Sequence, residues 1–145
     1  KNVVIYGHSM DDNPDGARFS QLKKYLDIEY CKQNPYIYFS TPEAELTWQI
    51  FAVYYTDINF DYIDPNPDAA KFTNMVSEMK QRSQFIFDAD VGINDNILTL
   101  STCTYKETTN RSNYRYVVQA KLLPAGASLT TPVKVEVNPS PKSPF

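Results

Sequence analysis

The sequence has few of the residues that most often carry chemistry. It contains a single histidine, His8, and two cysteines, Cys31 and Cys103. Any cysteine chemistry that needs an imidazole must therefore use His8. The two cysteines can form one disulfide in an oxidising compartment or remain two thiols, and the sequence leaves both states open.

Long apolar runs are also lacking. No stretch of eighteen apolar residues occurs, and the first residues show no signal-peptide pattern. We therefore expect this chain neither to span a membrane nor to carry its own export signal. The opening residues KNVVIYGH have the pattern of a strand that is already under way, so we expect the chain to be part of a longer protein.

Basic residues do not outnumber acidic ones. With 14 Lys and Arg against 17 Asp and Glu, the net charge is -3, which gives no basic field of the kind that nucleic-acid binding needs. The sequence also has no internal repeat. What the 145 residues do contain is 42% hydrophobic and 14% aromatic side chains, enough for one domain with its own core.

The first third of the chain predicts strands around one short helix. NVVIYG is β-branched and aromatic and is followed by the turn formers DDNPDG, which predicts a strand ending near Gly7 with His8 just past it. Apolar residues at helical spacing from Ala17 to Asp27 predict a short amphipathic helix that ends before Asn34 and Pro35. YIYFS and LTWQIFAVYYT then favour two antiparallel strands.

The remainder predicts one more helix and three strands. An apolar stripe after Pro67 indicates a helix, with Asn66 as its cap and Pro67 at its first position. ILTLST and YRYVVQAKLL are expected strands, and residues 133–137 are a further one. The chain then ends in a Pro- and Ser-rich tail that we do not expect to pack a core. The fold class is mainly β with added helices.

The strand ILTLSTC ends in a cysteine with small hydroxyl residues on both sides. A cysteine nucleophile needs a base or a thiolate, a cationic or hydrogen-bonding site for an oxyanion, and access to substrate. We expect Cys103 and Arg115 at facing ends of adjacent strands, and His8 also follows a strand end. The alternative is that Cys103 is a small core residue, His8 a solvated turn residue and Arg115 an outward-facing charge.

Three segments in combination resemble the sortases, the cysteine transpeptidases that attach proteins to Gram-positive cell walls. They are IYGHSM at His8, TLSTC at Cys103 and YRYVVQAK at Arg115, and the Thr-Leu-x-Thr-Cys pentapeptide is the signature of that family. The resemblance covers roughly residues 1–123. A long connection with a helix, at about residues 57–96, is similar to that of class B sortases.

The resemblance implies a closed β-barrel, which has eight strands in the family. This chain lacks the N-terminal helices and first strands, so we expect unsatisfied sheet edges unless another chain supplies the missing strands. Residues 1–126 are expected to form the catalytic domain. Residues 127–145 are expected to be a C-terminal strand and tail, a linker or remnant outside that domain.

The resemblance also assigns roles. Cys103 would attack the threonine carbonyl of a Pro-x-Thr sorting signal to form a thioester, and His8 would protonate the leaving amine. Arg115 would hydrogen-bond the oxyanion or the substrate backbone. Arg111 competes for this last role, but the apolar β residues and the Ala-Lys ending that follow Arg115 fit the family and favour Arg115.

The resemblance to the sortases also implies candidate residues of a substrate groove. Thr102 is one of them and is a further candidate donor to the oxyanion. The candidates are Tyr6, Ser101, Thr102, Tyr62 and Ile63. Aromatic and aliphatic residues in such loops fill cores at least as often as they contact ligands. No cofactor is implied, and no metal site is expected, because the acidic DDNPDG run lacks a regular ligand spacing.

The implied partners are surface proteins with a C-terminal sorting signal and an amine of a peptidoglycan precursor or cross-bridge. The implied location is the extracytoplasmic face of a Gram-positive cell membrane, reached through an N-terminal anchor absent from this chain. Two alternatives stay open. One is a pilin-polymerising sortase, whose acceptor is a lysine amine; the other is a non-catalytic β-rich surface binding module, in which a Cys31–Cys103 disulfide would be allowed.

Overall fold

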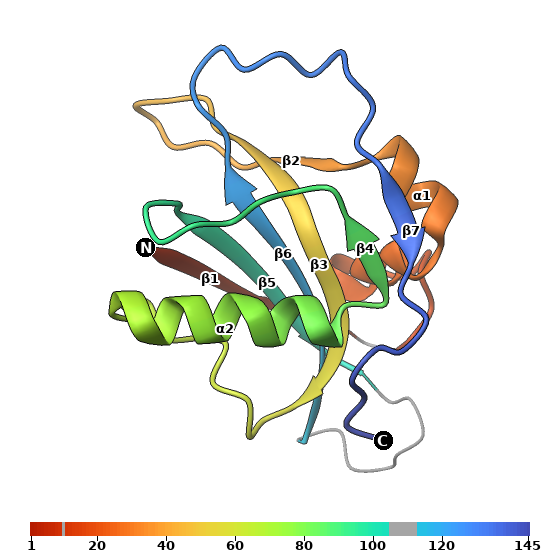
Figure 1. The fold of residues 1–145 in the computed structure, drawn as a ribbon. Coiled ribbons are helices and arrows are strands. Elements are labelled where there is room, and N and C mark those ends of the chain that lie inside the picture. The colour runs from red at the N-terminus through yellow and green to blue at the C-terminus, as the bar shows by residue number, and fades with distance from the viewer. Residues whose placement is uncertain (10, 105–112) are drawn as a thin grey trace.

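A five-stranded sheet forms the centre of the fold in the computed structural model, which describes residues 1–9, 11–104 and 113–145 (Figure 1). In spatial order its strands are β1 (Asn2–Gly7), β5 (Ile97–Cys103), β6 (Tyr114–Leu122), β3 (Thr47–Asp57) and β2 (Tyr36–Tyr38). The β1–β5 pair is parallel and the other pairs are antiparallel. The sheet is therefore mixed and open, with β1 and β2 at its edges.

Helices and a small second sheet cover the two faces. The helical segments are the 3-10 helix η1 (Arg18–Leu26), α1 (Ile28–Gln33) and α2 (Ala69–Arg82). The short strands β4 (Phe85–Phe87) and β7 (Val135–Val137) pair antiparallel with each other. In Figure 1, α2 crosses one face of the large sheet, while η1 and α1 lie on the side of β4 and β7.

Two apolar cores lie on opposite faces of the sheet. On β6, Tyr116 and Val118 point into the core shared with η1 and α1, whereas Val117 points into the core under α2. On β5, the neighbours Ile97 and Leu98 divide between the cores in the same way. A strand covered on both faces has apolar residues at consecutive positions, which explains the Ile97–Leu98 pair of β5 and the Val117–Val118 pair of β6.

The predicted strands are confirmed, but two helix predictions need correction. The single helix expected to end before Asn34 is divided into the 3-10 helix η1 and a separate helix α1, which ends at Gln33. The Asp27 side chain caps α1 by accepting a hydrogen bond from the Glu29 amide at 2.9 Å. The prediction had no such second helix.

The cap predicted for α2 is wrong. The helix begins at Ala69, and its cap is Asp68, whose carboxylate accepts from the Lys71 amide at 2.8 Å. Asn66 instead donates its amide to Asp64 at 2.9 Å, which makes a local turn one step earlier. Asn66 and Pro67 therefore lie before the helix and do not start it.

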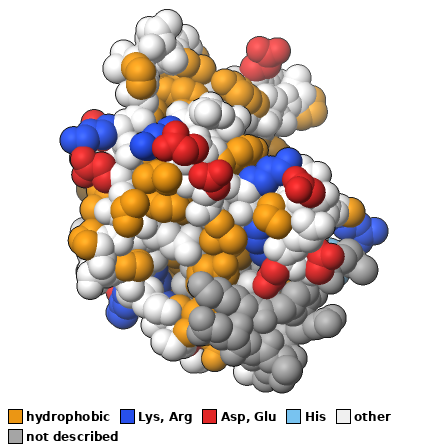
Figure 2. All heavy atoms as spheres, turned by 90° about the vertical axis from the view of Figure 1, so that its right-hand side faces the viewer, with side chains coloured by type: hydrophobic (Ala, Val, Ile, Leu, Met, Phe, Trp, Pro, Cys, Tyr) orange, Lys and Arg blue, Asp and Glu red, His pale blue; other side chains and the backbone are white. Residues whose placement is uncertain are grey.

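The surface near β7 and α1 carries charges of both signs. Figure 2 shows acidic and basic side chains interspersed with apolar ones on this face. No helix within residues 1–9, 11–104 and 113–145 is long and apolar enough to cross a membrane.

Candidate active site

A pocket of about 200 Å³ lies where β1 and β5 end and β6 begins. Its lining residues come from these three strands and from the residue after β1: Tyr6, Gly7, His8, Ser101, Thr102, Cys103 and Arg115. All predicted site residues except Tyr62 and Ile63 are in this lining. The predicted convergence of His8, Cys103 and Arg115 is therefore present.

Strand register accounts for the convergence. Gly7 pairs with Thr102 in the parallel β1–β5 ladder, so His8 and Cys103, each the next residue, leave the ladder side by side. Cys103 pairs with Arg115 in the antiparallel β5–β6 ladder. Three residues distant in the chain thus meet at one end of the sheet.

The two cysteines differ sharply in environment. Both thiols are free, but Cys31 is buried and Cys103 is partly exposed. The Cys31 thiol donates to the Tyr25 carbonyl at 3.3 Å, and burial raises the pKa of Cys31 to about 12. Cys103 is therefore the thiol that a reagent or substrate can reach, and the Cys31–Cys103 disulfide that the sequence allowed is not formed.

Gly7 is required by the close approach of η1. A Cβ atom at Gly7 would lie 2.1 Å from Cγ of the Phe19 ring, far inside van der Waals contact. The Phe19 amide also donates to the His8 carbonyl at 3.0 Å. Because η1 packs this tightly on the end of β1, it fixes the backbone that carries the imidazole. Sequence analysis missed this role of Gly7.

Two pocket hydroxyl groups form hydrogen bonds within the protein. Thr102 Oγ1 donates to the Gly7 carbonyl at 2.7 Å, which ties β5 to β1. Ser101 Oγ and Tyr62 Oη are 2.8 Å apart in a buried hydrogen bond. Burial raises the pKa of Tyr62, so its phenol stays protonated at neutral pH. Tyr62 thus supports the pocket from the core, and Ile63 is exposed outside the pocket lining.

A buried chain of hydrogen bonds attaches the 57–96 connection to the sheet. Tyr54 Oη donates to Gln119 Oε1 at 2.9 Å, and Gln119 Nε2 donates to Thr99 Oγ1 at 2.9 Å. Thr99 Oγ1 donates to Asn2 Oδ1 at 2.8 Å, and Asn2 Nδ2 donates to the Tyr62 carbonyl at 3.0 Å. Because each buried polar group in this network has a partner, the network fixes Tyr62 relative to β5.

Arg115 lies in the lining of the pocket. Its side chain is partly buried, and Nη1 donates to the carbonyl of the preceding Tyr114 at 2.9 Å. This contact and the register with Cys103 direct a permanent cation to the pocket. Arg111, the competing candidate, lies outside the described residues.

A buried lysine beside the pocket was not predicted. Lys23 of η1 donates to the Cys103 carbonyl at 3.0 Å. A signal was present in the sequence, because Lys23 follows Phe19 by four residues and Leu22 by one, which places it next to the apolar stripe of the predicted helix. A charged residue in that position was a candidate for a buried, paired group.

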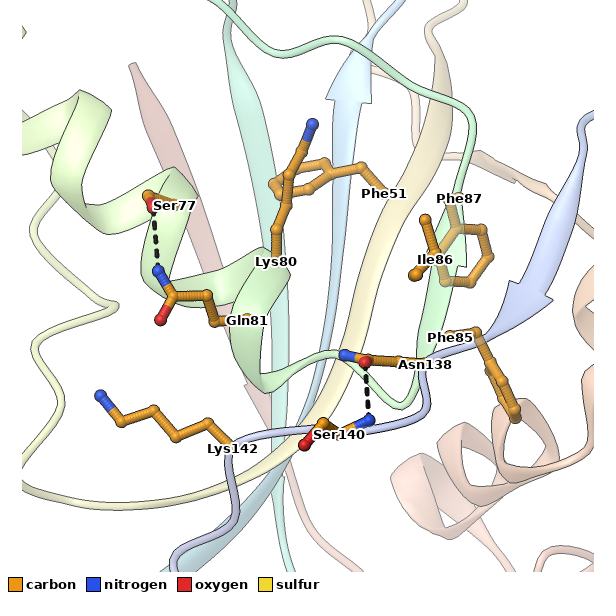
Figure 3. A pocket seen from close by; sticks show the side chains of 10 residues that line it. All are labelled: Phe51, Ser77, Lys80, Gln81, Phe85, Ile86, Phe87, Asn138, Ser140 and Lys142. Carbon is orange, nitrogen blue, oxygen red and sulfur yellow. Dashed lines mark hydrogen bonds between the residues drawn. The ribbon is translucent and has the colours of Figure 1, made fainter.

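A larger hollow of about 620 Å³ lies between α2, β4 and the segment after β7 (Figure 3). Phe51, Phe85 and Phe87 are among its lining residues, and its polar side chains make local contacts, such as the Lys80 ammonium donating to the Ala89 carbonyl at 2.7 Å. None of the predicted site residues lines it. Within the described part of the chain, no group of three or more His, Cys, Asp or Glu could hold a metal ion.

Comparison with known proteins gives one consistent family. A sequence model of the sortase domain matches residues 1–123. The chain is 35% identical over 124 residues to sortase B of Listeria monocytogenes, a match that covers 85% of the chain and 48% of the relative. The chain therefore spans about half the length of the curated relatives it matches.

Solved structures agree with this match. A Staphylococcus aureus sortase B–substrate complex aligns with a TM-score of 0.73 and 27% identity, over 86% of this chain and 56% of that chain. A sortase B complexed with triglycine aligns with a TM-score of 0.73 and 27% identity, over 86% of this chain and 56% of that one. The curled, mainly β sheet with few helices corresponds to part of these structures, which confirms the predicted fold class.

Proposed function

Because this chain belongs to the sortase family and its relatives are class B sortases, we propose that it is the catalytic portion of a cysteine transpeptidase. The observation that carries the proposal is the shared pocket of Cys103, His8 and Arg115. We assign this activity to residues 1–126. Residues 127–145 pack against this portion, because β7 pairs with β4 and Val135 is buried in the core shared with η1 and α1.

In the proposed reaction, Cys103 Sγ attacks the threonine carbonyl of a Pro-x-Thr sorting signal. The bond from that carbonyl to the next nitrogen breaks, and His8 gives a proton to the leaving amine. A thioester between the threonine and Cys103 remains. An acceptor amine then attacks the thioester, His8 takes the proton of that amine, and the thiolate leaves.

Arg115 has the position and chemistry of an oxyanion donor. The carbonyl oxygen gains negative charge during each attack, and a fixed guanidinium near Cys103 stabilises that charge more in the transition state than in the bound substrate. Register opposite Cys103 and the bond to the Tyr114 carbonyl hold the guanidinium in place. It therefore needs little reorganisation when the charge forms.

The substrate and acceptor classes rest on the relatives. One solved relative is a sortase B–substrate complex and another is complexed with triglycine, which supports a peptide substrate and an amine nucleophile for this chain. Tyr6 and Ile63 are exposed and are the proposed substrate contacts. Ser101, Thr102 and Tyr62 are buried and hydrogen-bonded within the protein, so their proposed role is to support the wall of the groove. The proposed site of action is the extracytoplasmic face of a Gram-positive membrane, and the proposed acceptor is a cell-wall peptide amine.

A transfer assay tests the function. The protein is mixed with a fluorescent Pro-x-Thr peptide and either triglycine or a lysine-bearing pilin peptide, and the products are identified by mass spectrometry. We expect cleavage after threonine and transfer to triglycine, with no product from Cys103→Ala. Transfer to the pilin lysine alone would identify a pilin-polymerising enzyme, and the absence of cleavage would leave the binding module as the interpretation.

A further inference from the structure

Lys23 is a charged side chain held almost entirely inside the protein. Its side chain is only 1% exposed, although it ends in an ammonium group. Burying an ammonium costs free energy unless partners replace its water. Burial lowers the pKa of Lys23, while the carboxylate of Asp12 raises it. The partners of the ammonium therefore decide what this lysine does.

Three acceptors surround the ammonium, which has three N–H groups to donate. Lys23 Nζ lies 2.6 Å from Ser9 Oγ, 3.0 Å from the Cys103 carbonyl oxygen and 3.2 Å from Asp12 Oδ1. Ser9 directly follows His8. One buried cation therefore joins the residue after the histidine to the backbone of the cysteine.

Asp12 extends the link to the other side of Cys103. The hydroxyl of the buried Thr104 lies 3.2 Å from Asp12 Oδ1 and 3.1 Å from Oδ2. Thr104 directly follows Cys103, so the Lys23–Asp12 pair holds the nucleophile at its own carbonyl and at the next side chain. The same pair holds the loop after β1 through Ser9 and Asp12.

We propose that Lys23 is a positioning residue that sets the placement of the Cys103 thiol relative to the His8 imidazole, a role that rests on the proposed function. Lys23 does not line the pocket, so it acts through the backbone of Cys103 and through Ser9.

Two physical effects follow from this placement. Displacing the thiol by a fraction of an ångström from its productive position slows transfer strongly. In addition, the ammonium and a Cys103 thiolate attract each other. The acidic groups that face Lys23 are Asp12 and Asp11. Removing the ammonium therefore leaves these carboxylates without it near Cys103, and Arg115 remains as the cation in the lining of the pocket.

The test removes the ammonium and keeps the length of the side chain. Lys23→Met is expected to lower kcat for peptide cleavage by about tenfold to a hundredfold, with KM little changed, because Lys23 does not touch substrate. The rate of iodoacetamide alkylation of Cys103 at neutral pH is expected to fall. Lys23→Arg, which keeps the charge and donors, should recover part of both effects.

Two further variants serve as a control and as a substitute for Lys23→Met. Lys24→Met is the matched control, because Lys24 is the next residue of η1 and makes none of the three contacts; its kcat and alkylation profile should equal those of the unaltered protein. If Lys23→Met does not fold, Ser9→Ala removes the ammonium's contact on the histidine side, together with the contacts of the Ser9 hydroxyl to the Asp11 carbonyl and to Ser20. A severalfold loss of kcat with an unchanged melting temperature is then expected.

Several outcomes would overturn the proposal. The first is that Lys23→Met, or Ser9→Ala in its place, has the same kcat and the same rate of Cys103 alkylation as the unaltered protein. The loss could also disappear under conditions where the variant is fully folded, which would make Lys23 a purely structural residue. If the unaltered protein cleaves no peptide, the proposed function fails, but the alkylation profiles still decide whether Lys23 controls Cys103.

Discussion

Arg115 lies directly opposite Cys103 in the antiparallel pair of β5 and β6. A donor held this way stabilises an oxyanion without moving, so Arg115→Ala is expected to reduce kcat by about 100- to 1000-fold. Arg115→Lys should be nearly as impaired, because a lysine keeps the charge and loses the planar donor fork. Steady-state peptide cleavage measures both variants.

A control for this loss lies on the same strand. Lys121 is near the other end of β6 and donates to the Asp90 carbonyl at 2.6 Å, away from the pocket. Lys121→Ala should keep kcat within about twofold, since surface changes of this kind cost little. An equal loss of kcat in Arg115→Ala and Lys121→Ala would contradict the role of Arg115 as an oxyanion donor.

Gly7→Ala is expected to destabilise the protein by about 1 to 3 kcal/mol, because the new Cβ overlaps the Phe19 ring. Gly92→Ala is the control, since its Cβ would have nothing closer than Asp95 Oδ2 at 3.9 Å. Urea unfolding compares them. The double variant Gly7→Ala with Phe19→Ala should lose less than the sum of its single changes, whereas simple additivity would contradict the clash.

The Tyr62–Ser101 hydrogen bond predicts a coupling energy. Tyr62→Phe or Ser101→Ala alone leaves one buried hydroxyl without its partner and should cost about 1 to 3 kcal/mol. The double variant should cost clearly less than the two together, because no partner is then left behind. A double-mutant cycle by chemical unfolding measures this. Full additivity would mean that the 2.8 Å contact contributes nothing in solution.

Glu78 predicts a pH dependence of stability. Its carboxylate accepts from Lys142 at 2.6 Å and from Arg82 at 2.9 Å, and these bonds lower the pKa of Glu78 below its ordinary value of 4.5. Because the pKa is lower in the folded state, the stabilisation is complete above pH 4.5 and is lost as the pH falls through the folded-state pKa.

Glu78→Gln should therefore lower the free energy of unfolding at pH 7 by a few tenths to about 1 kcal/mol, and the difference should shrink in acid. Glu43→Gln, at an exposed glutamate between β2 and β3, should show no such difference. Urea unfolding from pH 7 to pH 3 compares the variants. A Glu78→Gln effect that stays constant over this range would contradict the linkage.

The sequence predicted every strand of the structure except β4, because the signals of the others are local. The β-branched runs of β5 and β6 and the turn formers after Gly7 specify strands and their ends. The start of α2 was mispredicted by two residues because Asn66 and Asp68 are both good caps, and the Asp64 side chain engages Asn66 in a turn.

The parts that were missed depend on contacts distant in sequence. Nothing near Gly7 shows that Phe19 will press on it, and the pairing of β4 with β7 joins segments about fifty residues apart. Lys23 could be suspected from its place beside an apolar stripe, but its acceptors at Ser9, Asp12 and Cys103 become visible only in the folded chain.

The most direct test of the account is the mass of the protein after acid quench of its reaction with a Pro-x-Thr peptide in the absence of an acceptor amine. The account predicts an added mass equal to the acyl half of the peptide, located on Cys103, removable by hydroxylamine and absent from Cys103→Ala. The buried Cys31 should stay unmodified. Cleavage that proceeds without an adduct and survives Cys103→Ala would contradict it.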